Sequence, residues 1–199
     1  MNAIVVVDKN WCIGKDGGLL VHLPKDFKYF KEKTIGKTLI VGRKTLESFP
    51  GGKPLPGRKT IVLTRNASYK AEGAYVCHSK EEVLEKVKDL HPADVFVAGG
   101  GAIYRQFLDD VDKVFVTKIY NEYSGDTFFP NLDEDKDFVI ESERIHGRQC
   151  ILSFNPSVRH CAGSVVLYGI LCSNGEAHQR TALGYCRNTT TSCAARARR

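Results

Sequence analysis

The sequence has few of the features that mark membrane, metal-binding or secreted proteins. It contains no apolar run of about 18 residues, and its N-terminus does not resemble a signal peptide. No Cys-x-x-Cys pair occurs, so the usual ligand spacing of a zinc site is missing. Only Cys12 and Cys77 lie within residues 1–143, which fits a reducing compartment. We therefore expect a soluble, cytoplasmic protein that holds no metal and contacts no membrane.

Lysine and acidic residues almost vanish from the last quarter of the chain. The whole sequence has 29 Lys and Arg against 23 Asp and Glu, a formal net charge of +6. Residues 1–143 carry a net charge of −1, whereas residues 144–199 carry +7, with no Lys and a single acid, Glu176. The positive charge that could suggest nucleic-acid binding is therefore confined to the C-terminal part.

Three interpretations of this C-terminal part compete. It is a basic nucleic-acid arm, a Cys-rich metal or disulfide module, or a frame-shifted or fused terminus. Its arginines are scattered until residues 196–199, and residues 182–199 show neither a helical nor a strand period. Because natural domains are locally consistent, we favour the third interpretation. We expect a domain at residues 1–147 and an atypical Arg/Cys-rich extension at 148–199, frame-shifted or partly disordered.

Short apolar runs alternate with helical patterns along the first 145 residues. The runs that predict strands are Ala3–Val7, Thr38–Gly42, Thr60–Leu63, Val95–Ala98 and Lys113–Tyr120. A helix is expected from Asp26 and another after Gly42, and Ser79-x-x-Glu82 is a capping box that starts a third. This order predicts an α/β fold with a mainly parallel sheet, whose ligands bind at the carboxyl ends of the strands.

Asp26 and Phe30 are four residues apart, so both project from one face of the expected helix. A carboxylate beside an aromatic ring, directly after an apolar run, indicates a buried acid that handles a proton. The alternative is an N-cap or first-turn acid that the helix dipole favours.

Three strand ends carry groups that suit phosphate. Arg43, Lys44 and Thr45 follow one strand, Thr64 and Arg65 follow the next, and Gly99-Gly100-Gly101 lies between a strand and a helix. Alone, the glycines predict either a phosphate site or a tight turn that needs positive φ, and each Arg could be a solvated surface charge. Together the three ends predict a pyrophosphate site and a further phosphate site, as NADP(H) requires.

Five motifs stand in order along the chain, and together they resemble dihydrofolate reductases of the bacterial chromosomal type from Ala3 to about Ile145. They are Leu23-Pro24-Lys25-Asp26, Gly42-Arg43-Lys44-Thr45, Leu55-Pro56-Gly57-Arg58, Ile61-Val62-Leu63-Thr64 and Ala98-Gly99-Gly100-Gly101-Ala102-Ile103-Tyr104. The resemblance implies a twisted, mainly parallel, eight-stranded sheet flanked by helices on both faces. It also implies a monomer that reduces 7,8-dihydrofolate to tetrahydrofolate with NADPH, is a trimethoprim target and binds no nucleic acid.

The resemblance assigns roles to individual residues. Asp26 promotes protonation of pterin N5 while NADPH gives a hydride to C6, Thr117 hydrogen-bonds Asp26, and Leu20 belongs to a mobile loop over the nicotinamide. The residues implied in substrate binding are Val5, Val6, Asp26, Phe30, Arg58, Ala98 and Thr117, with Arg58 pairing with the glutamate α-carboxylate. A cis peptide is implied between Gly99 and Gly100.

The resemblance also implies a large cofactor site, with the adenosine 2′-phosphate near Arg43 and Arg65. Its residues are Val6, Ile13, Gly14, Gly18, Leu19, Leu20, Gly42, Arg43, Lys44, Thr45, Leu63, Thr64, Arg65, Ala98, Gly99, Gly100, Gly101, Ala102, Ile103 and Tyr104.

Two features depart from the family pattern. Val21 stands where the family usually has Trp, and the only Trp of this chain is Trp11. The family closes its sheet with a C-terminal hairpin, for which Phe138–Ile145 supplies one strand, and either Gln149–Phe154 or Ser164–Leu171 could supply its partner.

Three other functions remain open from the sequence. The reductase domain of riboflavin biosynthesis shares the fold and the cofactor, although Asp26 and Arg58 favour the folate enzyme. A protein that binds NADPH without turnover and a basic nucleic-acid binder are the other two.

Overall fold

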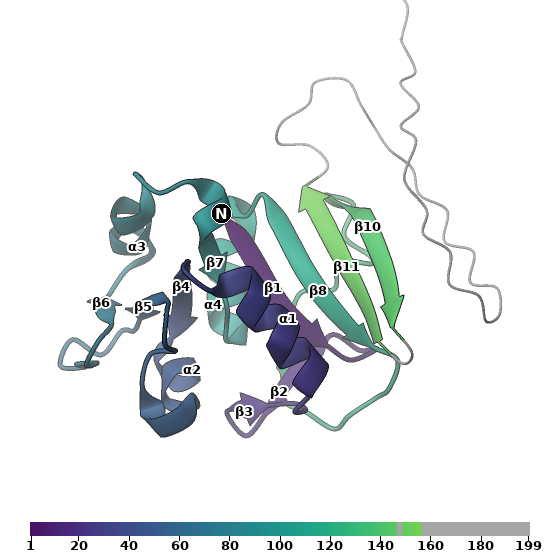
Figure 1. Ribbon diagram of the computed structural model, residues 1–199, viewed down its shortest axis with the longest axis horizontal. Helices are drawn as coiled ribbons and strands as arrows, with labels where there is room; N and C mark the ends of the chain where they lie inside the picture. Colours follow the sequence, from purple (N-terminus) through teal and green to yellow (C-terminus); the bar gives the residue numbers. More distant parts are fainter. Residues whose placement is uncertain (147–148, 157–199) are drawn as a thin grey trace, which may run out of the picture.

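The computed structural model describes residues 1–146 and 149–156, and within them the chain forms an eight-stranded sheet (Figure 1). The strand order is β10-β11-β8-β1-β7-β4-β5-β6. The strands are β1 (Asn2–Val7), β4 (Thr38–Gly42), β5 (Lys59–Leu63), β6 (Tyr75–Cys77), β7 (Val95–Val97), β8 (Lys113–Ile119), β10 (Phe138–His146) and β11 (Gln149–Pro156). The pairs from β8 to β6 are parallel, whereas β11 pairs antiparallel with both β8 and β10. The mainly parallel α/β sheet expected from the sequence is confirmed.

Alternate strand residues point to opposite sides of this sheet. Because the strands are apolar on both sides, helices cover both faces. On one face, Val5, Ile40 and Val97 belong to a core with side chains from α3 (Lys80–Val87) and α4 (Gly101–Phe107). On the other, Ile4, Leu39 and Phe96 pack against α1 (Pro24–Thr34), and Val41 and Val62 pack with α2 (Arg43–Glu47). Figure 1 shows α1 crossing in front of β1 and α4 behind the sheet.

Helix α1 begins two residues before the expected position. Pro24 stands in the first turn, where its missing N–H removes no helical hydrogen bond, and Leu23 is the N-cap residue. Asp26 is therefore a first-turn acid and not the N-cap. The capping box of α3 forms as expected on one side, since Ser79 Oγ accepts a hydrogen bond from Glu82 N at 3.2 Å.

Short elements that the sequence analysis did not anticipate complete the fold. A second sheet has the order β3-β2-β9, formed by β3 (Gly18–Leu19), β2 (Cys12–Lys15) and β9 (Thr127–Phe128). Single 3₁₀ turns lie at η1 (Pro50–Gly52), η2 (Pro92–Asp94) and η3 (Leu108–Asp110). No helix among the described residues is long and apolar enough to span a membrane.

The terminal hairpin exists, and this changes the expected domain boundary. Residues 149–156 form β11, which lies between β8 and β10, and Phe154 is almost completely buried. The sheet therefore extends past residue 147, the end of the domain that the sequence analysis expected, and includes residues 149–156. Residues 149–156 form an inner strand because every second residue, Cys150, Leu152 and Phe154, is apolar and buried in the core. The alternative partner strand, Ser164–Leu171, and the rest of the extension lie outside the described residues.

Candidate active site

One large cavity of about 1210 Å³ opens at the carboxyl ends of β1, β4, β5 and β7. This is the edge at which an α/β sheet binds its ligands. The cavity is large enough for a dinucleotide together with a second, drug-sized molecule. The position that the sequence predicted for the site is therefore the position of the cavity.

The structure brings nearly all the predicted site residues to this cavity. Those that line it are Val5, Val6, Ile13, Gly14, Gly18, Leu19, Leu20, Asp26, Phe30, Gly42, Arg43, Lys44, Thr45, Leu63, Thr64, Arg65, Ala98, Gly99, Gly100, Gly101, Ala102, Ile103 and Tyr104. Thr117 and Arg58 are not among its lining residues. Each of them contacts a residue that does line the cavity: Thr117 contacts Asp26 and Arg58 contacts Phe30.

Asp26 enters the cavity from the first turn of α1, beside Phe30 one turn further on. Its carboxylate hydrogen-bonds Thr117, a buried residue of β8 whose Cα pairs with Val6 of β1. Burial raises the pKa of Asp26 above its usual range, and the hydroxyl of Thr117 opposes this by stabilising the charged form. The site therefore holds an acid that keeps its proton to a higher pH than an exposed aspartate does.

Arg58 lies at the edge of the apolar end of the cavity. Its Nε donates to Thr34 Oγ1 at 2.8 Å and one terminal nitrogen donates to the Pro56 carbonyl at 3.0 Å. The guanidinium carbon lies 5.6 Å from the ring centre of Phe30, which does line the cavity. Arg58 is therefore fixed by two hydrogen bonds next to a cavity wall, in the range of a cation–π contact.

The other end of the cavity is cationic. Arg43, Lys44 and Arg65 all line it, together with the hydroxyl residues Thr45 and Thr64. Arg43 is oriented by Glu47, one helical turn away, at 2.9 Å. Thr64 is held by its backbone, since Thr64 N donates to Cys77 O of β6 at 3.0 Å. This end provides several donors for a phosphate group.

The three glycines form the floor between the two ends. The peptide bond between Gly99 and Gly100 is cis, as the resemblance implies, and Gly99 has a φ of +110°, a value that favours glycine. Gly42 N donates to Gly99 O at 2.8 Å, which ties this turn to the end of β4. A Cβ on Gly101 would lie 2.9 Å from Thr127 Cγ2 and 3.2 Å from Phe128 O, so no larger residue fits there without a shift.

A hairpin of β2 and β3 forms the wall over the glycines. Leu20 N donates to Ile13 O at 3.2 Å, and the segment before β9 supports the hairpin from outside. Asp126 accepts from Asp16 N at 2.9 Å and donates its own N–H to Gly14 O at 3.0 Å. The bond from Asp16 N, together with one from Thr127 Oγ1 to the same carboxylate, lowers the pKa of Asp126.

Further residues line the cavity that the sequence analysis did not assign to it. They are Ile4, Gly17, Val21, His22, Leu23, Phe27, Ser48, Phe49, Pro50, Leu55, Asn66, His78, Ser79, Arg105, Gln106 and Thr127. His78 and Ser79 follow β6, a strand that was not predicted, and His78 Nδ1 lies 3.0 Å from Thr64 O. Phe27 could have been found from the sequence, because it precedes Phe30 by one helical turn.

Comparison with known proteins gives one family. The family model described as "Dihydrofolate reductase" matches residues 1–154. The dihydrofolate reductase of Bacillus subtilis (strain 168) is 40% identical over 141 residues, which are 71% of this chain and 82% of that protein. The dihydrofolate reductase of Staphylococcus haemolyticus is 38% identical over 143 residues, covering 71% and 84%.

A solved structure agrees with these relatives. Dihydrofolate reductase from Enterococcus faecalis, complexed with NADP(H) and RAB-propyl, is 37% identical with a TM-score of 0.67, over 78% of this chain and 95% of that one. The matched region contains the sheet, the cavity and the terminal hairpin. The chain therefore belongs to the dihydrofolate reductase family, in its bacterial form.

Proposed function

We propose that this chain reduces 7,8-dihydrofolate to tetrahydrofolate with NADPH, and that Asp26 promotes the protonation of pterin N5. The observation that supports this most directly is a carboxyl group with a raised pKa in the wall of an apolar cavity. Reduction of a C=N bond adds a hydride to carbon and a proton to nitrogen. An acid whose pKa is moved toward neutrality suits the second part.

The apolar end of the cavity is the proposed pterin site. Val5, Val6, Phe30 and Ala98 are apolar residues that line the same cavity as the carboxylate, and with substrate bound they would exclude water and so strengthen its hydrogen bonds. Thr117 donates to one side of the carboxylate and so orients it toward the cavity. Arg58, at the edge of this end, would bind the glutamate α-carboxylate of the substrate.

The residues of the cationic end fit NADPH. The glycine floor has no Cβ at Gly99, Gly100 or Gly101, which allows the pyrophosphate to approach the backbone. Arg43, Lys44, Thr45, Thr64 and Arg65 would hold the 2′-phosphate and the groups next to it. When bound, NADPH supplies the hydride to pterin C6. Leu20 and its hairpin would cover the nicotinamide.

The consumption of NADPH with dihydrofolate as the second substrate tests the proposal. We expect dihydrofolate-dependent oxidation that trimethoprim inhibits. Asp26→Asn should keep the fold and the NADPH affinity while turnover near neutral pH falls by about two or more orders of magnitude, because proton-transfer assistance is lost. Asp89→Asn, the same change at an exposed position outside the cavity, is the matched control and should keep the parent rate.

Two outcomes would contradict the proposal. A parent chain that binds NADPH but oxidises none with dihydrofolate would be a binding protein without turnover. An Asp26→Asn variant with nearly the parent rate would remove Asp26 from the reaction while leaving the substrate assignment intact.

A further inference from the structure

Asp8 is a completely buried carboxylate that does not line the cavity. It follows the last residue of β1, and three backbone N–H groups donate to it. Oδ1 accepts from Asn10 N at 2.8 Å and from Cys12 N at 2.9 Å, and Oδ2 accepts from Tyr123 N at 2.9 Å. Removing a carboxylate from water is strongly unfavourable unless such bonds replace the lost hydration.

These three bonds join two segments that are far apart in the sequence. Asn10 lies in the turn between β1 and β2 and Cys12 is the first residue of β2, whereas Tyr123 lies in the segment between β8 and β9. A fourth bond, from Lys9 N to Asn121 O at 3.1 Å, lies beside them. The two oxygens of one side chain thus form a bridge of hydrogen bonds between the two segments.

Both segments continue directly into the wall of the cofactor site. The turn leads to Ile13 and Gly14, and the segment leads to Thr127, all of which line the cavity. The two segments meet again at that wall, where Asp126 N donates to Gly14 O. A change in their separation at Asp8 is therefore transmitted over only a few residues to the groups that face the nucleotide.

We propose that Asp8 is a positioning residue for cofactor binding. Its carboxylate holds the turn at residues 8–12 against the segment at 120–126, so that the wall formed by Ile13, Gly14 and Thr127 is built before NADPH enters. A wall that is preformed loses less conformational entropy on binding, and affinity for the cofactor is the quantity that depends on it.

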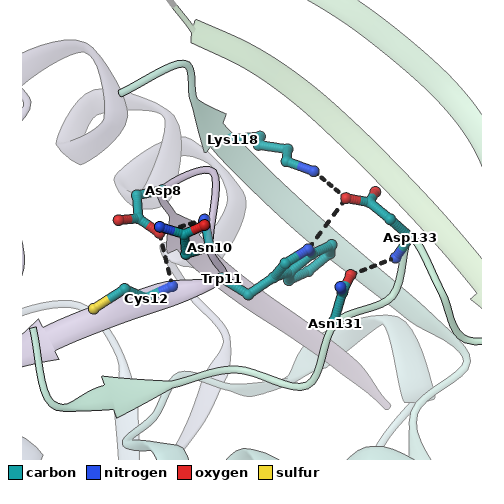
Figure 2. A network of polar contacts seen from close by, with 7 residues as sticks. All are labelled: Asp8, Asn10, Trp11, Cys12, Lys118, Asn131 and Asp133. Carbon is teal, nitrogen blue, oxygen red and sulfur yellow. Dashed lines mark hydrogen bonds and ion pairs between the residues drawn. The ribbon is translucent and has the colours of Figure 1, made fainter. Parts of the chain in front are cut away.

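The same turn has a second anchor that provides a control (Figure 2). Trp11 Nε1 donates to Asp133 Oδ2 at 3.1 Å, and Lys118 pairs with the same carboxylate while lying 5.0 Å over the Trp11 ring. Figure 2 shows Trp11 between Asp8 and Asp133. None of Trp11, Lys118 and Asp133 lines the cavity. This second anchor joins the turn to β8 and to Asp133 through contacts separate from the three hydrogen bonds of Asp8.

Asp8→Asn weakens the bridge between the two segments while the side chain keeps almost the same shape. A carboxamide has one acceptor oxygen and one NH₂ group. In either orientation of the carboxamide, its NH₂ group faces either Tyr123 N–H or the N–H groups of Asn10 and Cys12. Because two donors cannot hydrogen-bond to each other, at least one of the three bonds is lost. Asp133→Asn makes the same chemical change on the second anchor.

The test measures the KM for NADPH, the KM for dihydrofolate, kcat and the melting temperature of the full chain and both variants. For Asp8→Asn we expect the KM for NADPH to rise about tenfold, as the loss of one buried hydrogen bond allows, with the KM for dihydrofolate within about twofold of the parent. For Asp133→Asn we expect a lower melting temperature with both KM values within about twofold.

A purely structural role for Asp8 gives a different pattern. If both variants lose melting temperature and keep both KM values, or if Asp8→Asn raises the two KM values equally, the proposal is overturned.

Tyr123→Pro keeps the proposal testable if Asp8→Asn does not fold. It removes the one N–H that reaches Oδ2 and leaves the bonds from Asn10 and Cys12 in place. We expect the same selective rise in the KM for NADPH. A folded Tyr123→Pro variant with an unchanged KM for NADPH would overturn the proposal.

Discussion

Asp26 is an acid whose position favours its uncharged form. Burial raises its pKa, and the hydroxyl of Thr117 only partly offsets this effect. Residues used in catalysis often sit where burial destabilises the charge that an exposed side chain would carry at neutral pH. The same feature that suits Asp26 to proton handling must therefore lower the stability of the fold when Asp26 is ionised.

This coupling predicts that Asp26→Asn is more stable than the parent at neutral pH. An acid with a raised folded-state pKa contributes its stability at low pH and loses it as the pH rises through that pKa. Asparagine carries no charge and can still accept from Thr117, so it avoids the loss. Urea unfolding at neutral pH should give a higher midpoint for the variant, and the difference should disappear in acidic buffer below the ordinary Asp pKa. A variant that is less stable at neutral pH than the parent would contradict this coupling.

At the residue scale, the sequence predicted the chemistry of the site better than its shape. Asp26, Arg43 and Arg65 line the cavity, and their charge and their spacing in the sequence predicted that position. Val21 and Phe49 line the same cavity as apolar residues, and apolar residues of the same types occur both in a core and in a pocket wall. Only their three-dimensional position distinguishes the two.

The strand ends determine which elements supply each part of the site. Cations and hydroxyls follow β4 and β5, and the glycines follow β7, so three loops from adjacent parallel strands reach one cavity. This convergence follows from the strand order, and the sequence alone predicts it only once a parallel sheet is assumed.

Arg65, at the end of β5, provides a test of this arrangement. If it contacts the 2′-phosphate, Arg65→Gln should raise the KM for NADPH by about tenfold or more, as expected for a hydrogen bond to a charged group. The KM for NADH, which has no 2′-phosphate, should change much less. Arg144→Gln is a matched control, because Arg144 is exposed on β10 and does not line the cavity. An equal rise for NADPH and NADH would show that Arg65 does not contact the 2′-phosphate.

Strand β11 is the element that the sequence left undecided. Gln149–Phe154 and Ser164–Leu171 are both apolar runs of strand length, and local pattern does not say which of them reaches β8. The structure places residues 149–156 there, with Ile151 paired to Thr117. Strand β6 was missed for a related reason, since Tyr75–Cys77 is too short to show a period.

The position of β11 predicts different results for two shortened chains. A chain that ends before Gln149 loses the strand between β8 and β10 and leaves the core without Cys150, Leu152 and Phe154, at a cost comparable with the whole stability of a domain. We expect it to show no cooperative melting. A chain that ends at Pro156 should melt cooperatively and oxidise NADPH with dihydrofolate. Equal behaviour of the two chains would contradict the importance of β11.

The large sheet of the molecule combines a parallel part and an antiparallel part. Parallel strands β8 to β6 create the cavity, and the antiparallel pair β10 and β11 extends the sheet beyond β8 (Figure 1). The cavity has walls from α1, from the β2–β3 hairpin and from four strand ends, so its shape depends on elements spread between Ile4 and Thr127. The abrupt change in charge after residue 143 lies within β10, before the described part of the chain ends. Its interpretation as a frame-shifted or fused terminus stays a prediction.

Single-turnover hydride transfer from prebound NADPH to dihydrofolate, measured across a range of pH, tests the central claim most directly. The parent rate should fall as the pH rises through the raised pKa of Asp26, because the proton is then lost from the site. Asp26→Asn should be slower by about two or more orders of magnitude near neutral pH and should lack this transition. A parent rate independent of pH, or a variant that retains both the rate and the transition, would contradict the role of Asp26.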